Sequence, residues 1–291
     1  MVMINNNLRI FISVAEKGSF TAAAEELFIS QPAVSRSIKT LEEEFNLKLF
    51  YRDKRKGLLI TDAGKKILVL ARQMADLENH MYQVAFRENN FLGGKVRIAS
   101  MPILSSMILS KVFHDFNKKY PFVTLELIEG SASEIRKAVE EHQVDFGFTA
   151  SPFEELDAEV VLQDKMVAIS REQLIKNPVN LYDAEEKFIL CRAGYETVRE
   201  TLRRENITLS GSFIVQQAET VIHFVQQHNG IGIISEFVLA SIPNDLYCFP
   251  VTPEVKIDIG LVANNFNDLT PVAIELMNMI REQCRIFNSK L

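Results

Sequence analysis

Long hydrophobic runs are absent from this chain of 291 residues. No apolar stretch approaches the roughly 20 residues that span a bilayer, so we expect no membrane partner. The first residues, Met1 to Asn5, have neither the basic flank nor the apolar core of a secretion signal, which predicts a cytoplasmic protein. With 47% hydrophobic and 24% charged residues, the composition is that of an ordinary globular protein, long enough for about two or three domains.

Cysteine and histidine are both scarce. The three cysteines, Cys191, Cys248 and Cys284, are far apart and fit neither a metal site nor a redox pair, so we expect small buried residues in a reducing compartment. The five histidines are scattered. A Gly-rich phosphate loop, a nucleophile elbow and an HExxH motif are missing as well. We therefore expect no catalytic residues, no metal and no cofactor.

Positive charge is in deficit over the whole chain, whose formal net charge is −6. The deficit is uneven, because residues 1–66 contain eleven Lys or Arg against eight Asp or Glu, which leaves about −9 for the remainder. A basic part joined to an acidic part is typical of a nucleic-acid-binding module attached to a partner domain. The net negative charge therefore does not exclude DNA binding.

Short helices are predicted near the N-terminus. An apolar repeat at helical spacing over residues 8–15 predicts the first one. Ser19 or Thr21 is expected to cap an alanine-rich second helix. A turn at 28–30 then precedes Pro32, which suits the first turn of a new helix. Two helices joined by so short a turn predict a helix-turn-helix.

The helix that begins at this turn has two chemically different faces. At about 100° per residue, one face is apolar, with Val34, Ile38, Leu41 and Phe45. The opposite face and its N-terminal edge carry the residues expected to contact double-stranded DNA: Gln31, Pro32, Ser35, Arg36 and Lys39. Arginine can bind guanine and glutamine can bind adenine through two hydrogen bonds each, and helix-turn-helix proteins read bases with this part of the helix. A solvated face is the alternative for any single residue, but the whole set after a helix-turn signal predicts sequence-specific binding.

A basic hairpin is predicted after this helix. Residues 52–57 include Arg52 and Arg55, and the mainly apolar residues 58–61 follow. The charges would lie on phosphates and position the helix, since phosphate contacts carry no sequence information. Without the neighbouring helix, such a charge run would predict only a solvated loop.

A long helix is predicted between Gly64 and Gly93, because neither glycine nor proline occurs between them. Its apolar residues recur in alternating steps of three and four, as in the seam of a coiled coil. The predicted dimerisation residues are Ile67, Leu70, Met74, Leu77, Met81 and Val84. An identical second chain would bury this stripe and align two DNA-binding units on a palindromic site. The alternative is packing against the chain's own C-terminal domain.

Strands and helices alternate after Gly93. The strands are predicted at 95–100, 123–128, 144–148, 166–169, 188–191, 213–215, 231–234 and 257–262, and the helices at 105–120, 133–142, 198–204, 220–228 and 271–287. This alternation predicts an α/β fold of mostly parallel sheets with helices on both faces.

A ligand site is expected at the carboxyl ends of these strands, where helix N-termini offer free N–H groups and positive dipoles. The candidate effector-binding residues are Ser100, Met101, Pro102, Gly130, Ser131, Thr149, Ala193, Gln216 and Gln217. The helix termini favour an anionic or carboxylate-bearing small molecule, with Arg192 as an additional cation. Ser131 and Glu134 also fit a capping box, in which the serine would serve only its own helix.

The whole chain resembles the LysR-type transcriptional regulators. The resemblance is carried by residues 15–24, Leu27, 30–36, 41–44, 49–52 and 59–64, with Tyr120-Pro121 and Glu129-Gly130 in the second part. It implies a winged helix-turn-helix over 1–62, a linker helix over 63–92 that pairs two chains, and an effector-binding α/β domain over 93–291. This last domain would resemble periplasmic binding proteins. Its subdomains would cover about 94–161 with 267–291, and about 162–266, with a small-molecule effector in the cleft between them.

The same resemblance implies roles for single residues and for partners. It implies base and backbone contacts by the polar face defined above, with Thr21 and Ser30 beside it, and wing contacts by Arg52 and Arg55. It also implies homodimers or homotetramers, transcription that changes with effector occupancy, and RNA polymerase as a partner. Two features depart from the family pattern. Asn46 stands where glycine is common, although asparagine tolerates the left-handed conformation, and the wing is about one residue longer than usual.

Two other classes of protein share parts of this pattern. A solute-binding protein that delivers its ligand to a transporter would explain the α/β half, but it would need a secretion signal and would leave the basic N-terminal module without a use. An enzyme on the α/β sheet would need catalytic motifs that the sequence lacks, and turnover in an activity screen would favour it. A ligand-responsive transcription factor accounts for both halves.

Overall fold

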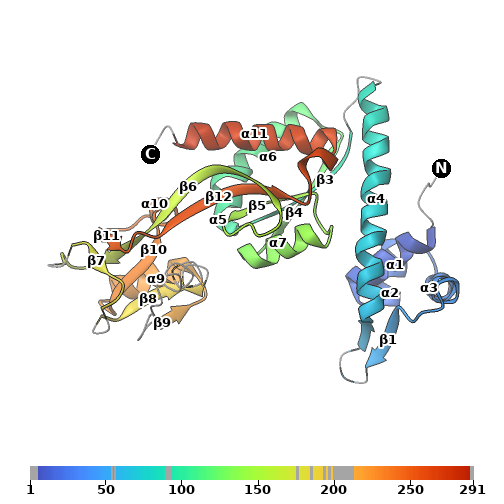
Figure 1. Ribbon diagram of the computed structural model, residues 1–291, viewed down its shortest axis with the longest axis horizontal. Helices are drawn as coiled ribbons and strands as arrows, with labels where there is room; N and C mark the ends of the chain where they lie inside the picture. The colour runs from blue at the N-terminus through green and yellow to red at the C-terminus, as the bar shows by residue number, and fades with distance from the viewer. Residues whose placement is uncertain are drawn as a thin grey trace.

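The computed structural model describes residues 6–53, 55, 57–88, 93–174, 177–183, 186–192, 195, 198 and 213–288. Its N-terminal part contains the helices α1 (Asn6–Lys17), α2 (Phe20–Glu26) and α3 (Gln31–Phe45), the hairpin β1 (Phe50–Asp53) and β2 (Gly57–Ile60), and the long helix α4 (Asp62–Glu88) (Figure 1). The predicted helix-turn-helix and hairpin are therefore confirmed. No helix in the described part of the chain is long and apolar enough to cross a bilayer.

Capping residues set the ends of the short helices. Ser19, and not Thr21, caps α2, and its Oγ accepts a hydrogen bond from the backbone N–H of Ala22. Ser30 caps α3 in the same way through Ala33, with Pro32 in the first turn. Asn46, which stands where the family commonly has glycine, ends α3 in the left-handed conformation that asparagine tolerates, with φ of 51°.

The N-terminal core holds α3 by its apolar face. Val34, Ile38 and Leu41 are buried against α1, α2 and the start of β1. The Phe11 and Phe50 rings meet edge to face, with centroids 5.5 Å apart. Phe45, which was predicted to belong to this apolar face, is 41% exposed, because this last residue of α3 extends beyond the core.

The second part contains one large mixed sheet, with β7 (Val179–Asn180) and β11 (Tyr247–Thr252) at its margin. Along the main path, its strands lie in the order β4 (Val123–Glu129), β3 (Gly94–Ser100), β5 (Phe146–Ala150), β12 (Lys256–Ala263), β6 (Asp157–Ser170), β10 (Ile231–Ser235), β8 (Phe188–Cys191) and β9 (Phe213–Val215). The strands β3, β4 and β5 are parallel, and so are β8, β9 and β10.

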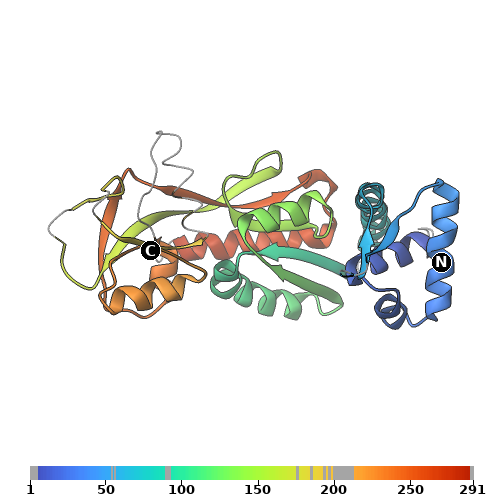
Figure 2. The same cartoon turned by 90° about the horizontal axis from the view of Figure 1, so that it is seen from below.

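The two strands that connect these halves are antiparallel to their neighbours. β12 runs against both β5 and β6, and β6 runs against β10 and β11. The prediction of mostly parallel sheets is therefore right within each half and wrong for the connection. The physical reason is that the chain enters the second half along β6 and returns along β12, so that these two strands point in opposite directions (Figures 1 and 2).

Helices cover both faces of the sheet, as predicted. On the first half, α5 (Pro102–Leu104), the π-helical turn η1 (Ser105–Leu109), α6 (Ser110–Lys119) and α11 (Pro271–Asn288) lie on one face, and α7 (Ala132–Glu140) lies on the other (Figure 1). On the second half, α9 (Ala218–Gln226) and α10 (Glu236–Ser241) pack against β10, and the short helix η2 (Phe266–Asp268) follows β12. The helix predicted at 198–204 lies outside the described residues except for Val198, which is helical and buried.

Candidate nucleic-acid interface and ligand cavity

The polar face of α3 is fully presented to solvent. Gln31, Pro32, Ser35, Arg36 and Lys39 are all exposed. Lys39 pairs with Glu43 at 3.5 Å one turn further along, whereas the Arg36 side chain has no ion pair or hydrogen bond to another described residue. Thr21 and Ser30 are exposed as well, but the Ser30 hydroxyl is engaged as the cap of α3. Arg36 is therefore a cation in the N-terminal half of an exposed helix, and its side-chain N–H groups donate to no other described residue. Such a side chain suits contacts with the edges of bases.

The hairpin is joined to α3 through Glu42. The Oε1 atom of Glu42 accepts hydrogen bonds from the backbone N–H groups of Leu49, at 2.9 Å, and Phe50, at 3.4 Å, and its Oε2 meets Lys48 Nζ at 2.5 Å. Although partial burial acts in the opposite direction, these partners hold the pKa of Glu42 below its usual range. One carboxylate therefore connects the start of β1 to α3.

The hairpin tip presents Arg52 and Arg55 to solvent. Asp53 Oδ1 accepts a hydrogen bond from the Arg55 backbone N–H at 2.8 Å, which closes the turn before Gly57, a residue with φ of 78°. Lys54 and Lys56, also part of the predicted charge run, lie outside the described residues.

A small cavity lies where the two halves of the α/β domain meet. Its volume is about 90 Å³. The lining residues are Met101, Ile103, Leu104, Ala150, Asp164, Met166, Cys191, Ala218, Ile234, Ser235, Phe237, Val238, Ile257 and Ile259. Both halves and both connecting strands contribute, so a ligand bound here would contact all of them.

Of the predicted effector-binding residues that the structure describes, only Met101 lines this cavity. The others have different environments. Ser100 is buried and donates its hydroxyl hydrogen to the Met101 carbonyl, Pro102 begins α5, Gly130 is half-buried beside α7, Gln216 and Gln217 are exposed, and Ala193 lies outside the described residues. Ser131 and Glu134 form the capping box that was the alternative interpretation. Thr149 is fully buried, and its hydroxyl finds no hydrogen-bond partner within the described structure.

Sequence reasoning missed most of the lining. Ala218 directly follows the predicted Gln217, and Cys191 ends a predicted strand, so extending the strand-end rule by one residue finds both. No sequence pattern indicated that Asp164 or Ser235 would line a cavity. Asp164 belongs to the unpredicted half of β6, and Ser235 has the pattern of an ordinary helix cap.

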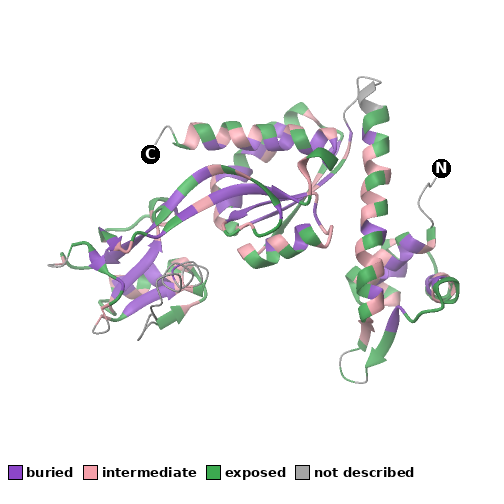
Figure 3. Cartoon of the chain, viewed as in Figure 1, coloured by how far each residue is buried: buried purple, intermediate pink, exposed green. Residues whose placement is uncertain are grey.

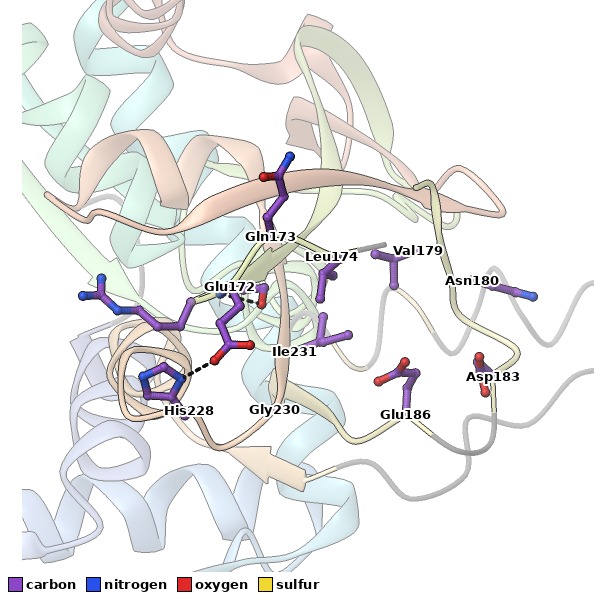
Figure 4. Close-up of a pocket in the computed structure, with 12 residues that line it drawn as sticks. Glu172, Gln173, Leu174, Val179, Asn180, Asp183, Glu186, His228, Gly230 and Ile231 are labelled. Atoms are coloured by element: carbon purple, nitrogen blue, oxygen red, sulfur yellow. Dashed lines mark hydrogen bonds and ion pairs between the residues drawn. The ribbon is translucent and has the colours of Figure 1, made fainter. Parts of the chain in front are cut away.

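A larger pocket of about 450 Å³ opens at the outer end of the second half (Figure 4). Its lining includes Glu172, Asp183, Glu186 and His228, and Glu172 Oε1 lies 3.4 Å from His228 Nδ1. Within the described chain, no group of three or more His, Cys, Asp and Glu residues is arranged to hold a metal ion. None of the predicted effector-binding residues in the described part of the chain lines this pocket, so we consider the smaller cavity the better candidate.

A polar junction connects α4 to the first half of the α/β domain. Arg97 of β3 lies between two carboxylates: its Nη2 is 2.8 Å from Asp145 Oδ1 and also binds Asp76 of α4. His142 Nδ1 is 3.2 Å from Asp76 Oδ2. Burial disfavours the charged form of Arg97, but the two carboxylates outweigh burial and raise the pKa of Arg97. For Asp145, burial is the largest effect, and it raises the pKa of this carboxyl group.

Arg72 extends this junction toward the DNA-binding part. Its guanidinium is buried on α4, and its Nη1 donates to the carbonyl of Glu141, the C-cap residue that follows α7, at 3.2 Å. Its Nη2 lies 3.4 Å from Glu16 Oε1 of α1. One side chain therefore touches the helix-turn-helix part, the long helix and the α/β domain.

The predicted dimerisation stripe lies on the opposite side of α4 from this junction. Leu70, Met74, Leu77, Met81 and Val84 are 45% to 62% exposed in the single chain, and Ile67 is half-buried against the N-terminal core (Figure 3). Packing of α4 against its own α/β domain, the alternative interpretation, therefore occurs on the junction face and leaves the apolar stripe uncovered.

Comparison with known proteins identifies both parts of the chain. Residues 5–65 match the family model of the bacterial regulatory helix-turn-helix protein, lysR family, and residues 89–285 match that of the LysR substrate binding domain. The chain is 44% identical over 286 residues to the uncharacterized HTH-type transcriptional regulator YoaU of Bacillus subtilis, covering 97% of this chain and 99% of that protein. It is 30% identical to the B. subtilis regulator YvbU over 287 residues, covering 96% and 98%.

Solved structures with the same fold include two full-length regulators. A full-length OxyR variant from Pseudomonas aeruginosa superposes with a TM-score of 0.76 at 18% identity, covering 98% of this chain and 95% of that one. Full-length CbnR in complex with its target DNA gives a TM-score of 0.59 at 20% identity, covering 97% and 100%.

Proposed function

The chain belongs to the LysR family of transcriptional regulators, and on that premise we propose how its described residues recognise DNA and respond to a ligand. It is a DNA-binding regulator with a substrate-binding domain and not an enzyme. The proposed boundaries are 1–62 for the winged helix-turn-helix, 63–92 for the linker helix and 93–291 for the effector-binding domain. We also propose that the protein acts in the cytoplasm and contacts RNA polymerase.

The exposed face of α3 reads the operator. The observation that carries this proposal is that Gln31, Ser35, Arg36 and Lys39 are all exposed while Val34 and the rest of the apolar face are buried. The α3 helix can therefore enter a major groove without disturbing the core. Arg52 and Arg55 of the wing lie on phosphates, which makes affinity fall as salt is added.

The substitution Arg36→Ala tests this assignment. We expect it to lower affinity for a DNA site selected by the wild-type protein by about tenfold or more, the cost of one lost bidentate contact. Lys111→Ala, which removes an exposed cation from α6, serves as the matched control and should leave affinity unchanged. Equal footprints from the Arg36→Ala and wild-type proteins, both shown to be folded by circular dichroism, would reject α3 as the reading element.

Two chains pair along the stripe on α4 and present two copies of α3 to a two-fold symmetric site. The uncovered leucines and methionines support this pairing, since a long apolar stripe on a helix is stable only when a partner covers it. CbnR, which shares the fold, was solved in complex with its target DNA. A tetramer would bring together two such pairs.

The ligand signal travels through the polar junction. An effector in the small cavity contacts Met101 at the end of β3, and Arg97 on the same strand binds Asp76 of α4. Arg72 then connects α4 to Glu16 of α1. A shift of β3 relative to the second half therefore reaches the DNA-binding part through these ionic contacts.

A further inference from the structure

The lining of the small cavity restricts the chemistry of its ligand. Of the fourteen lining residues that the structure describes, twelve are apolar or cysteine, and the other two are Asp164 and Ser235. Neither lysine nor arginine is among these lining residues. The ammonium of Lys165, which neighbours Asp164 in sequence, lies 3.3 Å from Glu236. Among the described residues, a ligand here therefore meets hydrocarbon, sulfur, one hydroxyl and one carboxyl group.

The polar atoms of Asp164 and Ser235 are already engaged. Ser235 donates its hydroxyl hydrogen to Asp164 Oδ2, and its Oγ accepts from the Val238 N–H at 3.2 Å. Asp164 Oδ1 accepts from the backbone N–H groups of Lys165, at 2.7 Å, and Phe237, at 3.2 Å. These bonds fix the N-terminus of α10. Burial of the Asp164 carboxyl group raises its pKa.

The N-terminus of α9 offers the complementary hydrogen-bond donors. Ala218, its first residue, lines the cavity, and the Gln217 side chain makes no capping hydrogen bond. The N–H groups of a first helical turn have no intrahelical partner, so an oxygen atom of a ligand can accept from them. A full negative charge would also be attracted there, but it would lose its hydration in an apolar cavity beside a buried carboxyl group.

We propose that the effector is a small uncharged molecule, mainly hydrocarbon, with one oxygen acceptor directed at the N-terminus of α9. This proposal rests on the proposed function of the cavity as the effector site. A cavity of about 150 Å³ can hold benzene, so a volume of 90 Å³ suits a compound of about four heavy atoms in its present form. Short-chain ketones and alcohols have this size and chemistry.

Three compounds of the same shape test the charge directly: acetone, acetate and the 2-propylammonium ion. Met101 and Met166 line the cavity, and the chain has nine methionines, so the methyl signals of ¹³C-methyl-labelled methionine can be assigned through Met101→Leu and Met166→Leu. We expect acetone to shift both signals saturably at millimolar concentration. Acetate and 2-propylammonium should bind at least about a hundredfold more weakly. Acetate would lose its hydration beside a buried carboxyl group, and the ammonium would meet only Asp164, whose oxygens already accept hydrogen bonds from Ser235 and two backbone N–H groups.

Substitutions in and outside the cavity provide the controls. Ala150→Leu fills the cavity and should abolish the acetone shift, whereas Ala158→Leu, at an exposed position of β6, should preserve it. If Ala150→Leu does not fold, Ile259→Val enlarges the same cavity and should improve binding of the larger 2-butanone. Shifts of the same signals by acetate or 2-propylammonium, or no shift with any probe, would overturn the proposal. Operator binding by the untreated protein is measured separately, so failure of the DNA-binding function is distinguishable from failure of the ligand assignment.

Discussion

Glu42 connects the recognition helix to the wing at the level of a single carboxylate. Its side chain is 10% exposed and accepts two backbone hydrogen bonds while it pairs with Lys48. A buried acceptor that satisfies otherwise unpaired N–H groups contributes more than an exposed ion pair does. Glu42 therefore connects the hairpin to α3 in addition to the core packing of Leu49 and Phe50.

We predict that Glu42→Ala lowers the free energy of unfolding of the N-terminal domain by about 1–3 kcal/mol, because two backbone N–H groups lose their acceptor. Urea denaturation at pH 7, followed by circular dichroism, measures the change. Glu44→Ala, at an exposed position of the same helix, is the control and should have little effect. Equal losses in the two variants would show that Glu42 is not a structural acceptor.

The pH dependence of Glu42 follows from the direction of its pKa shift. Its folded-state pKa lies below the unfolded value, so its contribution is present above the unfolded pKa and is lost as pH falls through the folded one. Wild-type stability should therefore decline more steeply than that of Glu42→Gln in acid. Parallel declines in urea titrations from pH 6 to pH 3 would contradict this.

Single residues of α3 were largely predictable from the sequence, while the cavity was not. Helical periodicity separated Val34 from Arg36, but Ser30, expected beside the DNA contacts, was not predicted as the cap of α3. Phe45 was misplaced because periodicity cannot tell where the covering core ends. Asp164 and Ser235 are brought together by strands far apart in the sequence, and only the tertiary fold reveals such a pair.

At the scale of elements, α4 has two chemically different faces on opposite sides. The junction residues Arg72 and Asp76 bind the effector-binding domain, while the stripe that includes Leu77 stays exposed. The sequence predicted the helix and its stripe, because both depend on local spacing. It could not predict the junction, whose partners Arg97 and Asp145 are distant in sequence. The first half of β6 was missed since exposed polar residues interrupt its apolar pattern.

We predict that Arg97→Met destabilises the effector-binding domain by about 3 kcal/mol, because Asp145 and Asp76 are left without their shared cation. The double variant Arg97→Met, Asp145→Asn should recover part of this loss. Thermal denaturation of both variants measures the effect. No recovery in the double variant would mean that packing, and not charge, holds the junction.

A second prediction at this scale concerns Arg72. Replacement with Met removes its bonds to Glu141 and Glu16, and we expect faster amide hydrogen exchange in α1 and at the end of α7. Lys137→Met, at an exposed position of α7, provides the control. Unchanged amide hydrogen exchange in Arg72→Met would show that α4 does not carry the ligand signal through Arg72.

At the scale of the whole molecule, a basic N-terminal part and an acidic remainder are joined by a helix with an exposed apolar stripe. The exposed stripe on α4 makes a testable prediction about assembly. Leu70→Gln combined with Leu77→Gln should weaken self-association at least about a hundredfold, since each dimer would lose four buried leucines. Sedimentation equilibrium compares this variant with Lys65→Gln, which changes an exposed residue outside the stripe. A wild-type protein that remains monomeric at micromolar concentration would reject the pairing.

The most direct test of the account is the DNA sequence that the protein selects from a random pool of duplexes. The wild-type protein should select a two-fold symmetric motif with two equivalent half-sites, because two α3 helices face the DNA together. Arg36→Ala should lose preference at one base pair in each half-site while the other positions and the salt dependence stay nearly the same. Selection of an unchanged motif by Arg36→Ala, Ser35→Ala and Gln31→Ala alike would contradict the assignment of α3 as the helix that reads DNA.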